Sequence, residues 1–504
     1  MSSLKKMMGR WFSTPWYPIL FGAYPALALM ASNIGQVKLD AGWRALLVCI
    51  AFAEILFILL RLLFRDWNRA ALLSTLWMAL FFSYGHTHIT LTEQVEDFDF
   101  TPWLISAWLV LAVVAVVWVV KKTPSPVTLN AIMLGLVATS LWQISSGVQR
   151  GGVHRLGAEN APVQDLTRPE NPPDVYYFIL DSYGREDLLK KAYGYDNSAF
   201  IEGLRERGFF VAECSQSNYI RTEISVASSL NMSYLQGLDD AFSPDSARRR
   251  ILWDSLKHSA VRYNFESMGY KTVAFATGFA WSELDDADVF YTPPPFSAGM
   301  TEFETLFMRT TLARHAQDLG WVDTDEIIGQ NFRDRTMLVF NTMNDIARIP
   351  EPTFAFVHLI SPHPPFVFGP NGEHTNPADF WNENRQYPSG LYAEGYQNQI
   401  TFLNHKMLQA VDTLIEESGV PPIIILQGDH GPWHQPKDRR FWILNAYYLP
   451  DHQDKLFSKI SPVNTFRYIF NAYFSGKYDM LPNISYFSPV PKLYEFSEVK
   501  NNCK

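Results

Sequence analysis

Two segments of the chain each end an apolar run with a carboxylate. Asp181 follows the apolar residues 178–180. Asp429 follows the apolar residues 423–426 after a short Gln-Gly step, with His430 directly behind it. Buried parallel strands read as continuous apolar runs, and ligands in open α/β sheets bind beyond the carboxyl ends of the strands. We therefore expect Asp181, Asp429 and His430 to meet in space, where two carboxylates and one imidazole suit a divalent metal such as zinc or manganese.

Histidines and hydroxyl residues accompany two further segments. His358 lies inside the apolar run 354–359, where it is either a satisfied core residue or a ligand, whereas His363 follows in a Pro-rich turn, where it can face a site. Residues 218–231 contain a cluster of hydroxyl side chains, including Thr222, and a helix-like stretch. Helix N-termini bind anions such as phosphate, although Ser and Thr also cap helices that have no ligand.

The elements that would position these residues form an α/β pattern. Residues 175–180, 272–276, 354–359 and 422–426 read as buried strands. Five apolar residues at helical spacing, between positions 400 and 414, precede the strand that leads to the second carboxylate. Strands that alternate with helices indicate a mostly parallel sheet flanked by helices.

The first part of the chain contains five long apolar stretches. Each approaches the ~20 residues that a membrane-spanning helix needs, whereas a cleaved signal peptide would give only one. Buried core helices are the alternative for any single stretch, but five in series with little between them favour a transmembrane helix bundle. The stretches cover residues 16–33, 43–64, 70–90, 103–120 and 129–148.

Charged residues indicate how these stretches are oriented. By the positive-inside rule the N-terminus is cytoplasmic, and five crossings put everything after residue 148 outside. We therefore predict a transmembrane domain at 1–148, a Pro- and Gly-rich linker at 149–173 and an extracytoplasmic domain at 174–504. Basic residues mark the predicted inner side, namely Lys5, Lys6, Arg10, Arg61, Arg65, Arg69, Lys121 and Lys122. Acidic residues mark the outer loop between the third and fourth stretches, namely Glu93, Glu96, Asp97 and Asp99.

Composition narrows the function classes. The 504-residue chain has a formal net charge of −9, which argues against a nucleic-acid partner. Its three cysteines show no metal-ligand or redox spacing. Cys49 lies in an apolar stretch and is expected to pack there, while Cys214 and Cys503 either form a disulfide outside the cytoplasm or remain free thiols.

Together, these segments resemble the alkaline phosphatase superfamily, and within it the membrane-bound sulfatase-like transferases of the phosphoethanolamine transferase and lipoteichoic acid synthase type. The resemblance covers five spans, a linker and an extracytoplasmic catalytic domain. It implies that Asp181 is the acidic metal ligand after the first strand, where the family often has Glu. It also implies that Thr222, in a Thr-x-x-Ser arrangement with Ser225, is the nucleophile and a metal ligand, and that Asp429 and His430 are the late ligand pair.

The resemblance also implies phosphate contacts. His358 and His363 match two family histidines, five residues apart, that bind phosphate or a second metal, and His363 would also act in catalysis. His434 is the candidate for a further family histidine, although it follows the Asp-His pair more closely than usual. Arg185 is a candidate for substrate binding because its fork matches phosphate geometry, with a surface ion pair as the alternative.

A metal-dependent transferase is the function that the resemblance implies. A phospho-head group of phosphoethanolamine or phosphoglycerol type would pass from a membrane phospholipid to Thr222 and then to a cell-surface glycan or glycolipid. Zinc or manganese would lower the pKa of the Thr222 hydroxyl. The expected location is the bacterial plasma (inner) membrane, with several crossings and the catalytic domain in the periplasm or outside the cell.

The chain departs from both branches of the superfamily. It has too few cysteines for the several disulfides of phosphoethanolamine transferases, and residues 214–218 lack the Pro and Arg of the sulfatase motif, so sulfate hydrolysis through formylglycine is not expected. One alternative is a phosphoric or sulfuric ester hydrolase that uses the same residues with water as acceptor. Others are an inactive scaffold for envelope polysaccharide assembly, which would bind no metal, and a transporter, although Glu54 is one of few polar residues within the apolar stretches.

Overall fold

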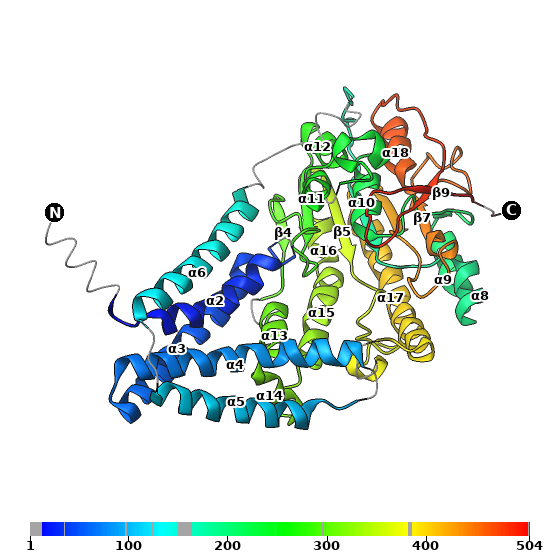
Figure 1. Ribbon diagram of the computed structural model, residues 1–504. Helices are drawn as coiled ribbons and strands as arrows, with labels where there is room; N and C mark the ends of the chain where they lie inside the picture. Colours follow the sequence, from blue (N-terminus) through cyan, green and yellow to red (C-terminus); the bar gives the residue numbers. More distant parts are fainter. Residues whose placement is uncertain are drawn as a thin grey trace, which may run out of the picture. The chain divides into compact units, whose positions relative to one another are not determined.

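The computed structural model describes residues 13–34, 36–95, 98–121, 125–149, 164–246, 248–294, 297, 299–381, 386–501 and 503 (Figure 1). The chain forms two compact units. The first comprises Met1–Gly152 and Ala298–Ile328, and the second comprises Val153–Ser297 and Gly329–Lys504. Most of the predicted linker, residues 150–163, lies outside the described residues, and so do Lys5, Lys6, Arg10, Glu96, Asp97 and Lys122 of the charge pattern.

The first unit contains one helix over each predicted apolar stretch. These helices are α2 (Tyr17–Ser32), α3 (Trp43–Phe64), α4 (Trp67–Gln94), α5 (Thr101–Lys121) and α6 (Pro126–Gln149). Within the described residues, three helical segments are long and apolar enough to cross a membrane, namely Leu39–Phe64, Thr101–Lys121 and Pro126–Ser146. Because α2 is short and α4 is less apolar, the five crossings and their orientation stay predictions.

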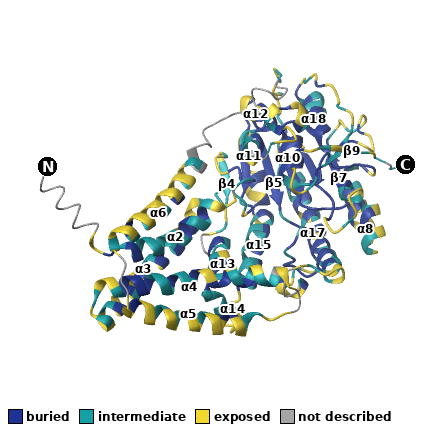
Figure 2. Ribbon diagram, viewed as in Figure 1, coloured by how far each residue is buried: buried dark blue, intermediate teal, exposed yellow. Residues whose placement is uncertain are grey.

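The surface of these helices fits a lipid environment. Exposed residues run along α5 and α6 in Figure 2, and on α5 they include Leu109, Val110 and Val113, which are each more than 60% exposed. A water-soluble protein rarely exposes an apolar surface of this extent. We conclude that the N-terminal part of the chain is a membrane domain.

A later segment of the chain completes the first unit. It contains α13 (Glu302–Arg309), η4 (Leu312–Arg314) and α14 (His315–Asp318). At Gly85 in α4 the backbone of this segment comes so close that an added Cβ would lie 2.3 Å from the Arg309 carbonyl oxygen. The neighbouring His86 N–H donates to the Thr310 carbonyl at 3.2 Å. The missing side chain of Gly85 is therefore what permits this contact.

The second unit is built on a seven-stranded sheet with the order β2-β7-β6-β1-β5-β3-β4. The central strands β6, β1, β5, β3 and β4 are parallel, and β7 and β2 add antiparallel pairs at one edge. This confirms the predicted α/β fold class. The strands are β1 (Val175–Leu180), β2 (Phe210–Val211), β3 (Lys271–Phe275), β4 (Val289–Tyr291), β5 (Thr353–Leu359), β6 (Ile423–Gly428) and β7 (Asn445–Tyr448).

Both faces of the sheet are buried, which explains why the central strands are apolar throughout. In β1, Val175, Tyr177 and Ile179 join one apolar core, and the alternate residues join the other. On the first face lie α10 (Thr222–Leu230), α11 (Arg249–Lys257), α12 (Ala260–Ser267) and α18 (Thr465–Tyr473), and α17 (Ser389–Glu417) covers the second. Figure 2 shows the strand β5 and the helix α10 almost entirely as buried.

The helix α17 shows why burial holds this layer in place. The predicted helical stripe between positions 400 and 414 faces the sheet, and Leu403, Met407 and Val411 have no exposed surface. Each fully buried side chain of this size stabilises the fold by about 1.5–3 kcal/mol. The remaining elements are α8 (Glu186–Tyr193), α9 (Ser198–Glu206), α15 (Thr324–Asn341), α16 (Met343–Ala347), β8 (Ser485–Phe487), β9 (Ser497–Val499), η1 (Leu39–Gly42), η2 (Leu235–Gly237), η3 (Asp240–Phe242), η5 (Pro377–Phe380), η6 (Arg439–Phe441) and η7 (Pro462–Asn464).

The register of the sheet sets the position of the candidate site. Leu180, the last residue of β1, lies opposite Gly428 of β6 and Leu359 of β5. An added Cβ on Gly428 would lie only 2.4 Å from the Tyr183 carbonyl oxygen, so a side chain there would push the two strand ends apart. The residues that follow β1 and β6 therefore meet at the carboxyl edge of the sheet.

Candidate metal centre

Asp181, Asp429 and His430 meet at this edge. One ligand atom from each residue lies within 4.8 Å of those of the other two, and all three residues are buried. His430 Nε2 is 3.4 Å from Asp429 Oδ2 and 3.9 Å from Asp181 Oδ1. The structure thus brings together the three predicted protein ligands.

The two carboxylate oxygens of Asp429 have different surroundings. Oδ1 accepts hydrogen bonds from the backbone N–H groups of Ser182, at 2.9 Å, and His430, at 2.8 Å. Oδ2 is buried and has no hydrogen-bond partner among the described residues. A buried acceptor that lacks a donor is costly, and buried charges in proteins are normally paired or bound to metals. A divalent cation fits this position because it would satisfy Oδ2.

Ser182 holds the loop after β1 in an unusual conformation. Its φ of +65° lies in the left-handed region, which costs a non-glycine residue about 1–3 kcal/mol. This turn aims the Ser182 N–H at Asp429, and the Ser182 hydroxyl donates to Asp181 Oδ1 at 3.2 Å. This role of Ser182 could not be predicted from the sequence, because an ordinary Ser in a loop carries no signal of this conformation.

His430 presents its second nitrogen to the cluster. Its Nδ1 lies 2.8 Å from the Gly431 carbonyl oxygen, which can only accept, so Nδ1 carries the proton. The lone pair of Nε2 then faces Asp429, Asp181 and Thr222. A hydrogen bond from the other ring nitrogen is the usual way in which proteins orient a metal-binding histidine.

Burial acts on the two carboxylates in the same direction, but their partners differ. Burial would raise the pKa of Asp181, yet the neighbouring imidazoles, His363 first, hold it well below its usual range. Burial and the Asp181 carboxylate raise the pKa of Asp429. Two adjacent buried carboxylates repel each other, and a cation between them would relieve that repulsion.

Thr222 lies beside this cluster as the first residue of α10. Its hydroxyl oxygen is 3.3 Å from His430 Nε2 and donates to Asp181 Oδ2 at 3.5 Å. A hydrogen bond holds α10 against the loop after β6, because the Ser225 hydroxyl donates to the Asp429 carbonyl at 2.7 Å. A hydroxyl group, two carboxylates and an imidazole therefore converge at one point.

The two histidines of the third segment also lie near Asp181. His358, on β5, is buried with Nε2 at 3.5 Å from Asp181 Oδ2, and neither of its ring nitrogens forms a hydrogen bond within the described residues. The backbone N–H of His363 donates to the Asp181 backbone carbonyl at 3.0 Å. The imidazole ring of His363 is near enough to depress the pKa of the Asp181 carboxyl. The predicted pair thus borders the cluster.

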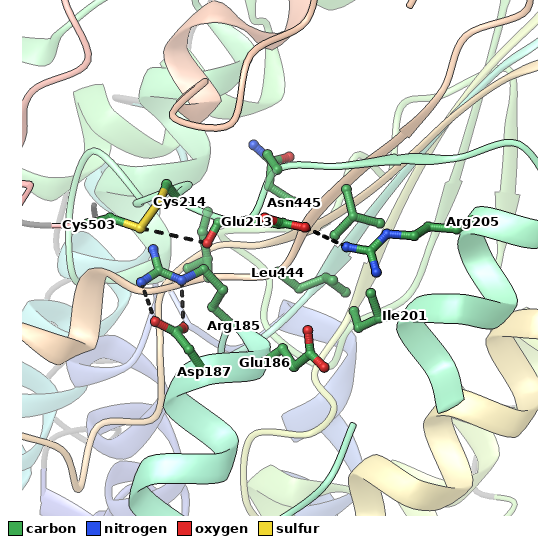
Figure 3. Close-up of a pocket in the computed structure, with 13 residues that line it drawn as sticks. Arg185, Glu186, Asp187, Ile201, Arg205, Glu213, Cys214, Leu444, Asn445 and Cys503 are labelled. Atoms are coloured by element: carbon green, nitrogen blue, oxygen red, sulfur yellow. Dashed lines mark hydrogen bonds and ion pairs between the residues drawn. A yellow bond between two sulfur atoms is a disulfide. The ribbon is translucent and has the colours of Figure 1, made fainter. Parts of the chain in front are cut away.

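His434 and Arg185 make their contacts elsewhere. The exposed His434 ring lies against Tyr392 and Trp433. Arg185 is buried, donates to both carboxylate oxygens of Asp187 and to the Ser215 carbonyl, and lines a separate cavity of about 400 Å³ (Figure 3). The Ser215 contact connects the loop after β1 to the segment that leads to Thr222.

Two arginines that the sequence analysis did not assign to the site flank Thr222. Arg221 directly precedes it, and Arg440 donates to the Ile220 carbonyl at 3.4 Å. Burial and then the charge of Arg221 lower the pKa of Arg440, and its buried Nε has no hydrogen-bond partner in the part of the chain that the structure describes. Two guanidinium groups close enough for the charge of one to lower the pKa of the other indicate a place for an anion.

Cys214 and Cys503 form a disulfide across 289 residues, beside the cavity of Figure 3. The sequence left free thiols open as an alternative. Disulfides persist mainly in oxidising compartments, so this bond supports an extracytoplasmic location for the second unit. It also ties the C-terminal segment to the loop before Thr222.

No family model matches the chain, and no curated protein does. Solved structures do match. The zinc complex of the C-terminal periplasmic domain of EptC from Escherichia coli shares 13% identity over 68% of this chain and 96% of that one, with a TM-score of 0.43. The lipooligosaccharide phosphoethanolamine transferase EptA from Neisseria meningitidis, an integral membrane protein, shares 10% identity over 90% of this chain and 94% of that one, with a TM-score of 0.39.

The lipoteichoic acid synthase LtaP from Listeria monocytogenes shares 12% identity over 59% of this chain and 73% of that one, with a TM-score of 0.32. EptA and LtaP are of the two types that the sequence motifs resemble. At these identities and TM-scores, the likenesses say nothing about the reaction of this chain.

Proposed function

We propose that the chain is a metal-dependent, sulfatase-like transferase of the cell envelope. It moves a phospho-head group from a membrane phospholipid to a cell-surface glycan or glycolipid through a phospho-threonine at Thr222. The position of the Thr222 hydroxyl carries this proposal. It lies at a helix N-terminus, 3.3 Å from His430 Nε2 and 3.5 Å from Asp181 Oδ2. In the same buried cluster, Asp429 Oδ2 has no hydrogen-bond partner among the residues that the structure describes.

Asp181, Asp429 and His430 are the residues that would hold zinc or manganese. Such a cation supplies positive charge that lowers the pKa of a neighbouring hydroxyl and screens a phosphate. The chain orients the nucleophile, because Asp181 accepts a hydrogen bond from the Thr222 hydroxyl while the Ser225 hydroxyl fixes α10 on the Asp429 carbonyl. This preorganisation lets the oxygen approach a phosphorus atom without a search for the correct geometry.

The transfer proceeds in two displacements. In the first displacement, the Thr222 hydroxyl gives up its proton to solvent and its oxygen forms a bond to phosphorus, while the bond from phosphorus to the diacylglycerol oxygen breaks and His363 gives a proton to that leaving oxygen. In the second, an acceptor hydroxyl forms a bond to phosphorus and gives its proton to His363, while the bond from phosphorus to the Thr222 oxygen breaks and that oxygen regains a proton from solvent. Arg221 and Arg440 stabilise the charge that develops on the phosphoryl oxygens.

The membrane domain supports a lipid donor. A site anchored at a bilayer meets phospholipid head groups at high local concentration, whereas an enzyme for soluble esters gains nothing from such an anchor. The disulfide supports a location outside the cytoplasm, where glycan acceptors occur.

Release of diacylglycerol tests this function. Full-length protein in nanodiscs with phosphatidylethanolamine and zinc should release diacylglycerol, and release should fall at least ~10³-fold in Thr222→Ala. Thr413→Ala, which removes a hydroxyl that donates only within α17, is the matched control and should keep wild-type release. Free phosphoethanolamine as the product, even with a glycolipid acceptor present, would identify a hydrolase instead. Release of diacylglycerol by Thr222→Ala at the wild-type rate would show that Thr222 is not the nucleophile.

A further inference from the structure

A second cavity lies within the membrane unit, between α3, α4 and α13. Its volume is about 550 Å³, within the ~300–1,000 Å³ of typical small-molecule pockets. The walls are mostly apolar, and one ion pair stands among them. The lining includes the apolar residues Cys49, Phe52, Phe82 and Phe307 and the charged residues Arg44 and Glu304.

The location of the cavity limits what can fill it. The helix α3 belongs to a segment that is long and apolar enough to cross a membrane, and Val48, which also lines the cavity, is 67% exposed. Apolar cavities stay dry, so water is a poor occupant. Hydrocarbon is the surrounding solvent at this position, and an acyl chain can enter from it without desolvating any polar group.

The ion pair is the polar feature that would select a ligand. Arg44 Nε donates to Glu304 Oε1 at 2.7 Å, and Arg44 also donates to the Gly299 carbonyl at 2.8 Å. Arg44 is the second residue of α3, so the pair lies at the end of the membrane helix, where head groups begin. Adjacent charges of both signs are complementary to a zwitterionic head group, which carries a phosphate and an ammonium.

The walls of the cavity are held in place by the docked segment. A capping box at Thr301 and Glu304 fixes the start of α13, and the close backbone contact at Gly85 fixes its end against α4. Phe307 of α13 packs against Phe82 of α4, with their ring centroids 6.0 Å apart. The cavity is therefore a preformed site that needs no large rearrangement to accept a ligand.

We propose that this cavity binds one acyl chain of a zwitterionic phospholipid, with the head group at the Arg44–Glu304 pair. The site uses no residue of the proposed reaction and does not depend on it. It retains one lipid at the membrane unit in addition to the lipids that surround the helices non-specifically.

Photo-cross-linking of the full-length protein in nanodiscs tests the proposal. The probe is a phosphatidylethanolamine with a diazirine in the middle of one acyl chain, and cross-linked residues are located by peptide mass spectrometry. We expect labels at Phe52, Phe82 and Phe307. The exposed α5 residues Leu109 and Val113, which contact any surrounding lipid, provide the internal control.

Filling the cavity should remove only the first set of labels. Two variants are designed to place an indole in the cavity. Cys49→Trp introduces it at a buried lining residue, and Val48→Trp introduces it at an exposed lining residue, where a large side chain is tolerated. In at least one correctly folded variant, labelling at Phe82 and Phe307 should fall at least fivefold while Val113 is labelled as before. Equal labelling of Phe82 and Phe307 in the wild type and the filled variants would overturn the site.

The head-group assignment has its own comparison. Glu304→Gln keeps the capping box, since Gln serves at that position, but removes the negative charge. In the wild type, unlabelled phosphatidylethanolamine should compete with the probe at least fivefold better than phosphatidylglycerol does. In Glu304→Gln, the two unlabelled lipids should compete with the probe equally well. Equal competition by the two lipids in the wild type would overturn the zwitterionic selectivity.

Discussion

Asp429 divides its carboxylate between two tasks. Oδ1 accepts hydrogen bonds from two backbone N–H groups and thereby joins the loops after β1 and β6. The buried Oδ2 lies 3.4 Å from His430 Nε2 and forms no hydrogen bond within the described part of the chain. An Asn at this position can keep the first set of contacts but replaces an anionic ligand atom by a neutral group. The structural and the metal-binding roles of this residue can therefore be separated.

Asp429→Asn should fold and lose its metal. The amide oxygen can still accept from Ser182 and His430, so we expect little change in thermal stability of the metal-free protein. Metal per chain, measured by inductively coupled plasma mass spectrometry after zinc loading and dialysis, should fall at least ~10-fold. Asp412→Asn, which removes a carboxylate on α17 that pairs with Arg207, is the control. Equal metal content in the two variants would contradict the ligand assignment.

Arg440 is predicted to act on the phosphoryl group. Its substitution by Gln removes a charge that burial and Arg221 already make costly to maintain, so the folded protein should tolerate the change. We expect kcat/KM for head-group transfer to fall about 10²-fold with unchanged metal content. Arg348→Gln, which breaks an exposed pair with Glu417, should leave kcat/KM unaltered. Wild-type transfer by Arg440→Gln would exclude the role.

Asp174 should make stability depend on pH. Burial raises its pKa to about 6, against 3.8 for the free side chain, and the Thr353 N–H partly opposes this. The folded protein therefore binds the proton more tightly, so this contribution to stability is complete below about pH 4 and is lost as pH rises through 6. The loss is on the order of 3 kcal/mol. In Asp174→Asn, the fall of Tm between pH 4.5 and 7 should be smaller than in the wild type. An identical fall in the two proteins would show that Asp174 does not contribute to the pH dependence of stability.

The sequence predicted the residues that follow long strands. Asp181, Asp429 and His430 could be placed together because parallel neighbours end at one edge of a sheet. Arg440 and Ser182 could not be predicted in their positions. Their placement depends on loop conformation, such as the positive φ of Ser182, for which the sequence carries no periodic signal.

At the scale of elements, the long and strongly patterned segments were predictable. The predicted strand 175–180 coincides with β1, and the stripe from 400 to 414 lies on α17. The antiparallel edge was missed, because β2 has two residues and β7 has four, too few to show an alternation. The docking of α13 was missed as well, since an amphipathic pattern shows that one face is buried but not against what.

Gly85 tests the docking of α13. In Gly85→Ala the new Cβ would meet the backbone at Arg309, Thr310 and Thr311 within 2.6 Å, and a backbone cannot rotate away as a side chain does. Overpacking of this kind costs about 1–3 kcal/mol, so Tm in detergent should fall. In Gly135→Ala on α6 nothing lies within 4 Å, and helix propensity should leave Tm unchanged or slightly raised. A Tm for Gly85→Ala equal to that of Gly135→Ala would contradict the close contact.

At the scale of the whole molecule, the chain contains the first unit, with the membrane helices, and the second unit, with the seven-stranded sheet, and it passes from one to the other more than once. The segment Ala298–Ile328 belongs to the first unit, although more than a hundred residues of the second unit precede it. Hydropathy does not reveal this return, because the segment is short and amphipathic rather than apolar. The disulfide between Cys214 and Cys503 supports an extracytoplasmic location for the second unit.

The central claim is that Thr222 carries the transferred group. The most direct test is the mass of the Thr222 peptide from full-length protein incubated with zinc and phosphatidylethanolamine, without an acceptor. We expect an added phosphoethanolamine at Thr222 that disappears when a glycolipid acceptor is supplied. Thr222 that remains unmodified while diacylglycerol is released would contradict the covalent mechanism.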